Sequence, residues 1–474
     1  MENLKEFINR IKNARIHIVG VSGSEGSSIL NFLVDNNISQ ITAHDFVATE
    51  NLEKNFKIWH KGIESKKRNK LFKEFQCNLE KTRFCDRKKY LENIEEAQVV
   101  FLAQSWRLYP QNQPLKFLKD KIPFYSLTRL YLDFAPAAII AVTGTVGKGS
   151  CASLISEILS HGDKKVYFAG NESWRIQLAD KFNLMAPSDF LVIEVSHRQL
   201  NEGFTKAPQT LLMTNLFPNH LDEMSWPGYV KLKMSLARAQ GKNDRTIINY
   251  DNLELRQQTQ NLNSQRFYYS LKEKNMNIKS VRNIYDELMN IKSVHYPENI
   301  LAVCTLAKIL EINDKTIIEA IAKSEGLPAR IQEIGNYQGT KVINDIKSTT
   351  PWATLAALKK FKLPLVLIAG GDTKGIEANT LWDFVRKNEI EIVFMDSPLS
   401  KEAENKLPAL SRQRTDSLEE ALKLALNKTP PGGTVLVSPA AANFYSRFIK
   451  GKKSLRKIIT SLLPEAKATK GPEK

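Results

Sequence analysis

A Gly-rich turn between a strand-like run and a helix-like stretch is the feature that most constrains the fold of this chain. The apolar run 137–142 predicts a buried strand, and residues 151–159 predict a helix. The turn between them reads Gly-Thr-Val-Gly-Lys-Gly-Ser over residues 144–150. Glycines let backbone N–H groups approach phosphates, and the following helix presents the positive end of its dipole. The order strand, turn and helix therefore predicts a phosphate-binding loop in an α/β domain.

The residue types of this turn suit a nucleotide. Lys148 adds a positive charge, and the hydroxyl of Ser150 can reach a metal ion. The full phosphate-loop pattern is not met, because Val142 stands where that pattern has its first glycine. An ordinary strand-to-helix turn is the structural alternative. The nucleotide-binding residues that we expect here are Gly144, Thr145, Val146, Gly147, Lys148, Gly149 and Ser150.

Short apolar runs alternate with helical segments along almost the whole chain. Most of the runs end in Gly, Ser, Asn or Asp. This alternation predicts parallel sheets covered by helices, with ligands at the carboxyl ends of the strands. The expected strands are 15–20, 40–43, 98–103, 138–143, 190–195, 210–215, 341–344, 365–369, 392–395 and 434–437.

The length and two breaks in the pattern predict three α/β domains. The chain has 474 residues, enough for about three domains. One boundary is expected just before the phosphate-loop strand, and the other at Gly326-Leu327-Pro328, after helical segments at 299–310 and 315–324. We therefore expect domains over 1–134, 135–325 and 326–474: a Rossmann-like domain, a central domain like a P-loop ATPase, and a second Rossmann-like domain.

Composition excludes several classes of protein. The net charge is +17, but the 68 basic residues are dispersed and form no known nucleic-acid module. We therefore expect a basic surface that attracts anionic small molecules, and no nucleic-acid partner. No apolar run is long enough for a membrane span, and the start of the chain lacks the apolar core of a signal peptide. The 4 cysteines have neither metal-type spacing nor disulfide-scaffold density, so we expect a cytoplasmic protein.

A second Gly-rich turn occurs near the start of the chain. Residues 21–28 follow the first expected strand and precede a helix, and Asp45 follows the next strand. The arrangement resembles a dinucleotide fingerprint but departs from its spacing. A site for part of a nucleotide and a purely structural turn are both compatible with it.

Three further residues carry chemistry downstream of the phosphate loop. Glu194 ends an apolar strand, where a carboxylate beside a phosphate loop suits Mg²⁺. His220 follows the next strand, and Lys233 lies four residues after Tyr229 on the same face of a helix. Taken by itself, Glu194 is typical of a solvated strand end and Lys233 of a surface lysine.

Together these motifs resemble the Mur ligase family. Their order is G-T-x-G-K, E-x-S-x-x-Q-L, T-N-x-x-x-x-H-x-D and Y-x-x-x-K. The resemblance continues through Gly170-Asn171, Gly326-Leu327-Pro328-Ala329-Arg330, residues 344–349, residues 370–375 and Ser438-Pro439-Ala440. It covers most of residues 137–450, whereas the first 130 residues match only in pattern.

The resemblance implies an ATP-dependent amide ligase that works through an acyl phosphate. The first domain would hold the UDP part of the substrate, the second ATP and Mg²⁺, and the third the incoming amino acid. The closest pattern implies that D-glutamate is added to UDP-N-acetylmuramoyl-L-alanine, in the cytoplasmic synthesis of peptidoglycan precursors that serves cell shape and division. We expect a monomer.

The resemblance also assigns roles to individual residues. The catalytic residues would be Lys148, His220 and Lys233, with Lys233 carbamylated. The metal ligands would be Ser150, Glu194, His220 and Lys233. Further nucleotide contacts would come from Asn299, Arg330 and Asp345, and substrate contacts from Asn171, Lys347, Thr349, Lys374 and Asn443.

Departures from the family pattern leave rival interpretations open. Gly-Lys-Gly-Ser is typical of folylpolyglutamate synthases, Ser105-Trp106-Arg107-Leu108 replaces the usual S-P-G-I, and Asn443 replaces a serine. A folylpolyglutamate-type ligase, a Mur-like ligase for L-glutamate or another acidic amino acid, and an ATP-binding scaffold without ligase activity are the alternatives. The N-terminal α/β domain and the Glu194–Leu200 motif argue against the first, and the retained Glu194, His220, Lys233 and Lys347 argue against the last.

Overall fold

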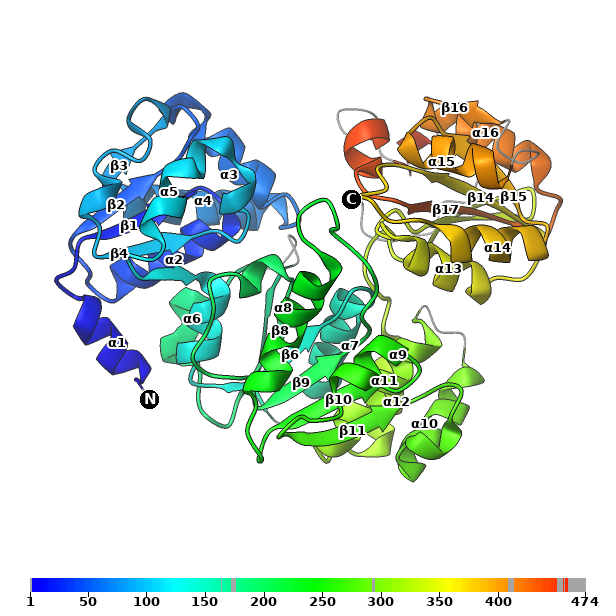
Figure 1. The fold of residues 1–474 in the computed structure, drawn as a ribbon, viewed down its shortest axis with the longest axis horizontal. Coiled ribbons are helices and arrows are strands. Elements are labelled where there is room, and N and C mark those ends of the chain that lie inside the picture. The colour runs from blue at the N-terminus through cyan, green and yellow to red at the C-terminus, as the bar shows by residue number, and fades with distance from the viewer. Residues whose placement is uncertain are drawn as a thin grey trace. The chain divides into compact units, whose positions relative to one another are not determined.

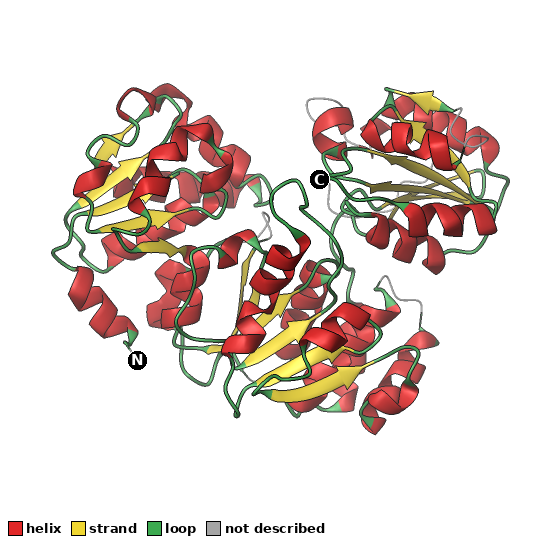
Figure 2. Cartoon of the chain, viewed as in Figure 1, coloured by secondary structure: helices red, strands yellow, loops and turns green. Residues whose placement is uncertain are grey.

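The chain folds into two compact units, which are described separately. The computed structural model describes residues 2–162, 164–171, 176–291, 295–407, 413–449, 455 and 457–458 (Figure 1). The first unit comprises 1–214, 230–282 and 302–320, and the second 215–229, 283–301 and 321–474. Helices and strands alternate in both (Figure 2).

The first sheet of the first unit is parallel, with strand order β3-β2-β1-β4-β5. Its strands are β1 (Ile16–Val19), β2 (Ile41–His44), β3 (Arg83–Cys85), β4 (Val99–Leu102) and β5 (Phe124–Ser126). Strands β1 and β4 are buried along their whole length, because helices cover both faces of a parallel sheet. The helices are α1 (Leu4–Ile11), α2 (Ser24–Asp35), α3 (Leu52–Trp59), α4 (Ser65–Leu79), α5 (Gln113–Leu118) and α6 (Leu127–Phe134).

The second sheet of the same unit is also parallel, with order β11-β10-β9-β6-β8-β7. Its strands are β6 (Ala138–Thr143), β7 (Val166–Gly170), β8 (Phe190–Glu194), β9 (Thr210–Met213), β10 (Arg245–Asn249) and β11 (Gln265–Tyr269). The phosphate-loop strand β6 lies between β8 and β9, so the turns after all three strands meet at one edge. The helices along this part of the chain are α7 (Lys148–Ser160), α8 (Trp226–Ala239), α9 (Leu253–Gln258), α10 (Lys279–Met289), α11 (Pro297–Ile309) and α12 (Asp314–Lys323).

The third sheet lies in the second unit, with order β12-β13-β17-β14-β15-β16. Its strands are β12 (Gln332–Tyr337), β13 (Thr340–Asn344), β14 (Leu365–Gly370), β15 (Glu391–Met395), β16 (Arg414–Thr415) and β17 (Thr434–Ala440). Helices α13 (Pro351–Lys360) and α14 (Asn379–Lys387) cover one face, and α16 (Leu418–Lys428) covers the other (Figure 1). Helix α15 (Pro398–Lys406) packs with the first group.

The α/β class with parallel sheets is confirmed, and every expected strand is present within a few residues. The strands that the sequence did not indicate are the inner strand β10 and the strands at the edges of the three sheets, β3, β5, β7, β11, β12 and β16. One pair differs in kind, because β12 and β13 are antiparallel. Gln338 and Gly339 between them both have positive φ, as a two-residue hairpin requires. The three domains and the two boundaries between them remain a prediction.

No helix in the described part of the chain combines the length and the apolar character needed to cross a membrane.

A pair of buried histidines joins β1 to β2. Leu91 donates its N–H to His44 Nδ1 (3.2 Å), so His44 carries its hydrogen on Nε2 and donates it to His17 Nδ1 (2.8 Å). Both rings are therefore neutral. Burial lowers the pKa of His17 to about 4 and that of His44 to about 3, and the neighbouring Arg83 acts in the same direction.

Acid should therefore destabilise the first unit. Both folded-state pKa values lie below the ordinary 6.5, so the unfolded chain binds more protons as the pH falls from 6.5 towards 4. The free energy of unfolding should fall by about 1.4 kcal/mol per pH unit for each histidine. Urea unfolding between pH 7 and pH 4.5 measures this slope. His17→Gln should reduce it, whereas the exposed His161→Gln should not; equal slopes in all three proteins would contradict the assignment.

Candidate functional site

The phosphate loop between β6 and α7 is held in one conformation by its glycines and by β9. Gly144 and Gly147 have φ values of +139° and +88°, which side chains other than glycine rarely adopt. Thr214 donates its hydroxyl to the Val146 carbonyl (2.6 Å) and so fixes the turn from the next strand. Lys148 begins α7 and folds back to donate Nζ to the Thr145 carbonyl (3.1 Å). The loop therefore has the shape of an anion cradle at a helix N-terminus.

Lys233 is a buried amine beneath this loop rather than a surface lysine. It projects from α8, is 1% exposed, and donates Nζ to Thr143 Oγ1 (3.1 Å) and to the Val195 carbonyl (3.4 Å). Burial lowers the pKa of Lys233 well below its ordinary value; the charge of Lys148 also lowers this pKa, and Glu194 opposes the shift. The site therefore brings Lys148, Glu194 and Lys233 together, and the burial of Lys233 favours its neutral amine form.

Glu194 and Asn171 lie at neighbouring strand ends. Glu194 is the buried last residue of β8, and Asn171 follows β7 and donates its backbone N–H to the Glu194 carbonyl (3.2 Å). The Asn171 side chain is exposed and accepts a hydrogen bond at Oδ1 from Gln104 Nε2 (3.1 Å). Ser150 is half-buried in the first turn of α7. Carboxylate and hydroxyl oxygens suit Mg²⁺, whereas an amine at position 233 fits it only after conversion to a carbamate.

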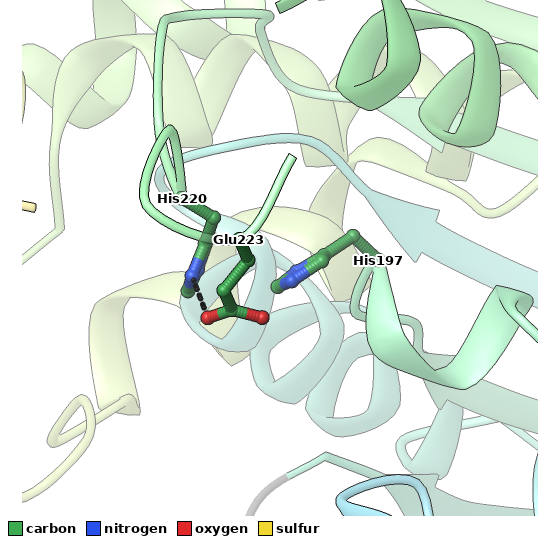
Figure 3. A group of neighbouring side chains, drawn as sticks. All are labelled: His197, His220 and Glu223. Atoms are coloured by element: carbon green, nitrogen blue, oxygen red, sulfur yellow. Dashed lines mark hydrogen bonds and ion pairs between the residues drawn. The ribbon is translucent and has the colours of Figure 1, made fainter. Parts of the chain in front are cut away.

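His220 lies in the second unit, on the loop between β9 and α8. Its backbone is left-handed, with φ +57°, and Nδ1 lies 2.9 Å from Glu223 Oε1 (Figure 3). The ring faces that of Tyr229, with centroids 6.4 Å apart. Because Glu223 occupies Nδ1, a metal ion would bind His220 through Nε2.

The second unit also holds three expected nucleotide contacts. Asp345 follows β13, is 1% exposed, and accepts hydrogen bonds from Ile331 N (3.2 Å) and Ser438 Oγ (2.8 Å). Burial raises the pKa of Asp345 to about 6, against hydrogen bonds and the charge of Arg330, so these two residues lie near each other. Asn299 is 7% exposed in the first turn of α11, and its Nδ2 has no hydrogen-bond partner among the described residues. A buried donor without a partner fits an external acceptor such as a nucleotide base.

The expected amino-acid contacts gather at one edge of the third sheet. Lys347 and Thr349 follow β13, Lys374 follows β14, and Asn443 follows β17, which lies between those two strands. Lys347 and Thr349 are exposed and Lys374 is half-buried. The side-chain amide of Asn443 donates a hydrogen bond to Asp372 Oδ2 (2.7 Å).

A cavity of about 140 Å³ opens at the carboxyl end of the first sheet, and sequence reasoning found it only in part. Asp45 lines it, yet its carboxylate accepts from Ser22 N (3.0 Å) and Ser22 Oγ (2.6 Å) and so braces the Gly-rich turn. Glu25 and Gln104, which the sequence did not single out, also line the cavity. In the sequence, the only indication that these two residues belong to a site was their position, Glu25 beside a Gly-rich turn and Gln104 after a strand.

The segment 105–108, which stands in place of the usual S-P-G-I, connects the first sheet to the second. Trp106 is buried and donates Nε1 to Glu202 Oε1 (2.9 Å), and Arg107 and Lys119 approach the same buried carboxylate. A buried carboxylate is stable only when it is paired in this way. This departure therefore serves the packing of the first unit.

The fold and these sites define an α/β protein with a phosphate-type loop beside a cluster of polar strand ends. Comparison with known proteins gives the family. Residues 142–308 match the Mur ligase middle domain. The UDP-N-acetylmuramoylalanine–D-glutamate ligase of Listeria monocytogenes is 30% identical over 71% of this chain and 76% of its own length. The protein of the same name from Acetivibrio thermocellus is 27% identical over 97% and 99%.

Solved structures agree in fold. A pseudomurein peptide ligase type C from Methanothermus fervidus superposes with a TM-score of 0.55 over 95% of this chain and 100% of its own, at 16% identity. UDP-N-acetylmuramate–alanine ligase from Thermotoga maritima gives 0.53 over 92% and 99%, also at 16% identity. The chain belongs to the Mur ligase family.

The buried amine of Lys233 should react with CO₂. A neutral amine is the nucleophile in carbamate formation, and burial favours that form of Lys233 because it lowers the pKa of the amine. Protein equilibrated with ¹³C-bicarbonate at pH 8 should show one slowly exchanging carbamate carbon by NMR. Lys233→Met should lose it, and exposed Lys242→Met should keep it. A spectrum without a carbamate signal in folded wild-type protein would contradict this assignment.

Proposed function

We propose that this protein joins D-glutamate to UDP-N-acetylmuramoyl-L-alanine, using ATP and Mg²⁺, in the synthesis of peptidoglycan precursors. Membership of the Mur ligase family makes the chain an ATP-dependent amide ligase. The particular substrates are supported by relatives with this name that match nearly the whole length. The use of ATP and Mg²⁺ is supported by the cluster of Lys148, Glu194 and the buried Lys233 beside the phosphate loop.

The reaction has two steps. A carboxylate oxygen of the alanyl group attacks the γ-phosphorus of ATP, the bond to the β–γ bridging oxygen breaks, and ADP leaves. The amino group of glutamate then attacks the acyl carbon, loses a proton, and expels inorganic phosphate as the amide forms. Mg²⁺ would neutralise the charge that develops on the phosphoryl oxygens.

The residues of the first unit divide this work. Lys148 and the loop amides would stabilise the transferring phosphoryl group. Ser150, Glu194 and a carbamylated Lys233 offer oxygen ligands for Mg²⁺, and His220 of the second unit offers a nitrogen. The exposed amide of Asn171 would contact the acyl substrate.

The remaining roles follow the predicted three domains, 1–134, 135–325 and 326–474. The first would hold the UDP part in the cavity beside β1. Asn299, Arg330 and Asp345 would contact ATP, and Lys347, Thr349, Lys374 and Asn443 would hold glutamate. We propose a monomer that acts in the cytoplasm.

Removal of the loop cation should abolish most turnover. Lys148→Ala leaves the Gly-rich turn in place but deprives the transferring phosphoryl group of its loop ammonium. We expect kcat to fall by roughly 10²-fold or more, as for loss of a main electrostatic stabiliser. Phosphate release in the presence of UDP-N-acetylmuramoyl-L-alanine and D-glutamate measures this. Lys242→Ala, on the surface of the same unit, should behave as wild type; near-normal turnover of Lys148→Ala would contradict the role.

The amino acid should carry a second carboxylate. Lys347 and Lys374 place two ammonium groups on loops at the same edge of the third sheet, after β13 and β14, and each can hold a carboxylate by charge-assisted hydrogen bonds worth roughly 1.5–3 kcal/mol. Alanine and glycine should therefore react poorly, and Lys374→Ala should raise KM for glutamate. Competition between D- and L-glutamate, read by chiral analysis of the product, should favour the D-form. A preference for a neutral amino acid would contradict the two-cation argument.

A further inference from the structure

Glu25 is a buried carboxyl group in the cavity at the end of the first sheet. It occupies the second position of α2, is 6% exposed, and lines the cavity together with Gly20, Gly23 and Ser24. These neighbours form the turn from β1 into α2, where backbone N–H groups and the helix dipole favour an anion. An ionised carboxylate at this place would oppose the same anion.

The carboxyl group is fixed by donors from two other strand ends. Gln104, after β4, donates its backbone N–H to Glu25 Oε2 (2.7 Å), and the Gln199 side chain, after β8, also donates to it. The Gln104 side chain continues the network, because it donates to Asn171 Oδ1 (3.1 Å) and accepts from Ser196 Oγ (2.8 Å). Glu25 therefore connects the first cavity to the region proposed to hold the acyl end of the substrate.

The surroundings of Glu25 favour its neutral form. Burial raises the pKa of Glu25 to about 7, although the Gln104 and Gln199 hydrogen bonds act in the opposite direction. The titratable groups around it are the buried Tyr131 and three residues that line the same cavity, Asp45, Tyr90 and Tyr109. No lysine or arginine among the described residues lines the cavity.

We propose that Glu25 is a specificity-determining residue that controls binding of the substrate's diphosphate. Protonated Glu25 admits the diphosphate and donates its hydroxyl hydrogen to a phosphate oxygen, whereas the ionised carboxylate repels the diphosphate. This inference rests on the proposed function, because it takes the UDP part to lie in this cavity. It predicts that the enzyme binds the UDP substrate more weakly as the pH rises through neutrality.

Isothermal titration calorimetry with UDP-N-acetylmuramoyl-L-alanine tests the proposal. The diphosphate diester and carboxylate of this ligand do not titrate between pH 6 and pH 9. Wild-type Kd should rise roughly 25-fold from pH 6.5 to pH 8.5, because only the protonated fraction of Glu25 binds the ligand. Titrations at pH 8 in buffers of different ionisation enthalpy should show uptake of close to one proton per ligand, a readout that needs no variant.

The variant Glu25→Gln separates this role from a structural one. The amide is neutral at every pH and keeps the shape of the side chain, so its Kd should be nearly constant and lower than that of wild type at pH 8.5. The control Glu53→Gln, at an exposed carboxylate on α3, should follow wild type. Retained pH dependence in Glu25→Gln, or wild-type binding without proton uptake, would overturn the inference while leaving the proposed function standing. Failure of wild type to bind the ligand at any pH would instead contradict the proposed function.

Discussion

The burial of one amine organises the centre of this protein. Lys233 reaches from α8 to Thr143 at the end of β6 and to the carbonyl of Val195 after β8, so it joins two strand ends and a helix. Burial at 1% exposure and the nearby cation Lys148 both disfavour the ammonium form of Lys233, whereas the carboxylate of Glu194 favours it. The position is stable for a neutral amine and suitable for a carbamate, which would balance Lys148 and supply oxygens beside Glu194. Stability and proposed chemistry therefore depend on the same site.

The first unit also contains two buried carboxyl groups, Glu202 and Glu25, whose surroundings differ. Glu202 is held by Trp106, Arg107 and Lys119, and these contacts fix the segment after β4 against the second sheet. Among the described residues, the hydrogen bonds to Glu25 come from the neutral donors Gln104 and Gln199, and burial raises the pKa of this carboxyl group to about 7. Glu202 is paired with cations, which suits a structural role. Glu25 is held by neutral hydrogen-bond donors, which suits a role in the control of ligand binding.

Periodicity and turn chemistry made much of this structure predictable. The apolar runs identified the central strands, and the Gly-rich turn placed the phosphate loop between β6 and α7. Edge strands such as β3 and β16 were not predicted because they are short and polar. The β12–β13 hairpin was not predicted because it depends on positive φ at Gln338 and Gly339. Lys233 by itself is typical of a surface lysine, and only the family resemblance placed it in the site. The pairing of Asn443 with Asp372 depends on a tertiary contact that no local pattern encodes.

The central claim is that the ligase forms an acyl phosphate, and isotope transfer tests it most directly. UDP-N-acetylmuramoyl-L-alanine with both carboxylate oxygens replaced by ¹⁸O is incubated with ATP, Mg²⁺, D-glutamate and the enzyme, and the released phosphate is analysed by mass spectrometry. The account predicts that one ¹⁸O atom appears in each inorganic phosphate and one remains in the amide. Phosphate without ¹⁸O, accompanying amide formation, would contradict it.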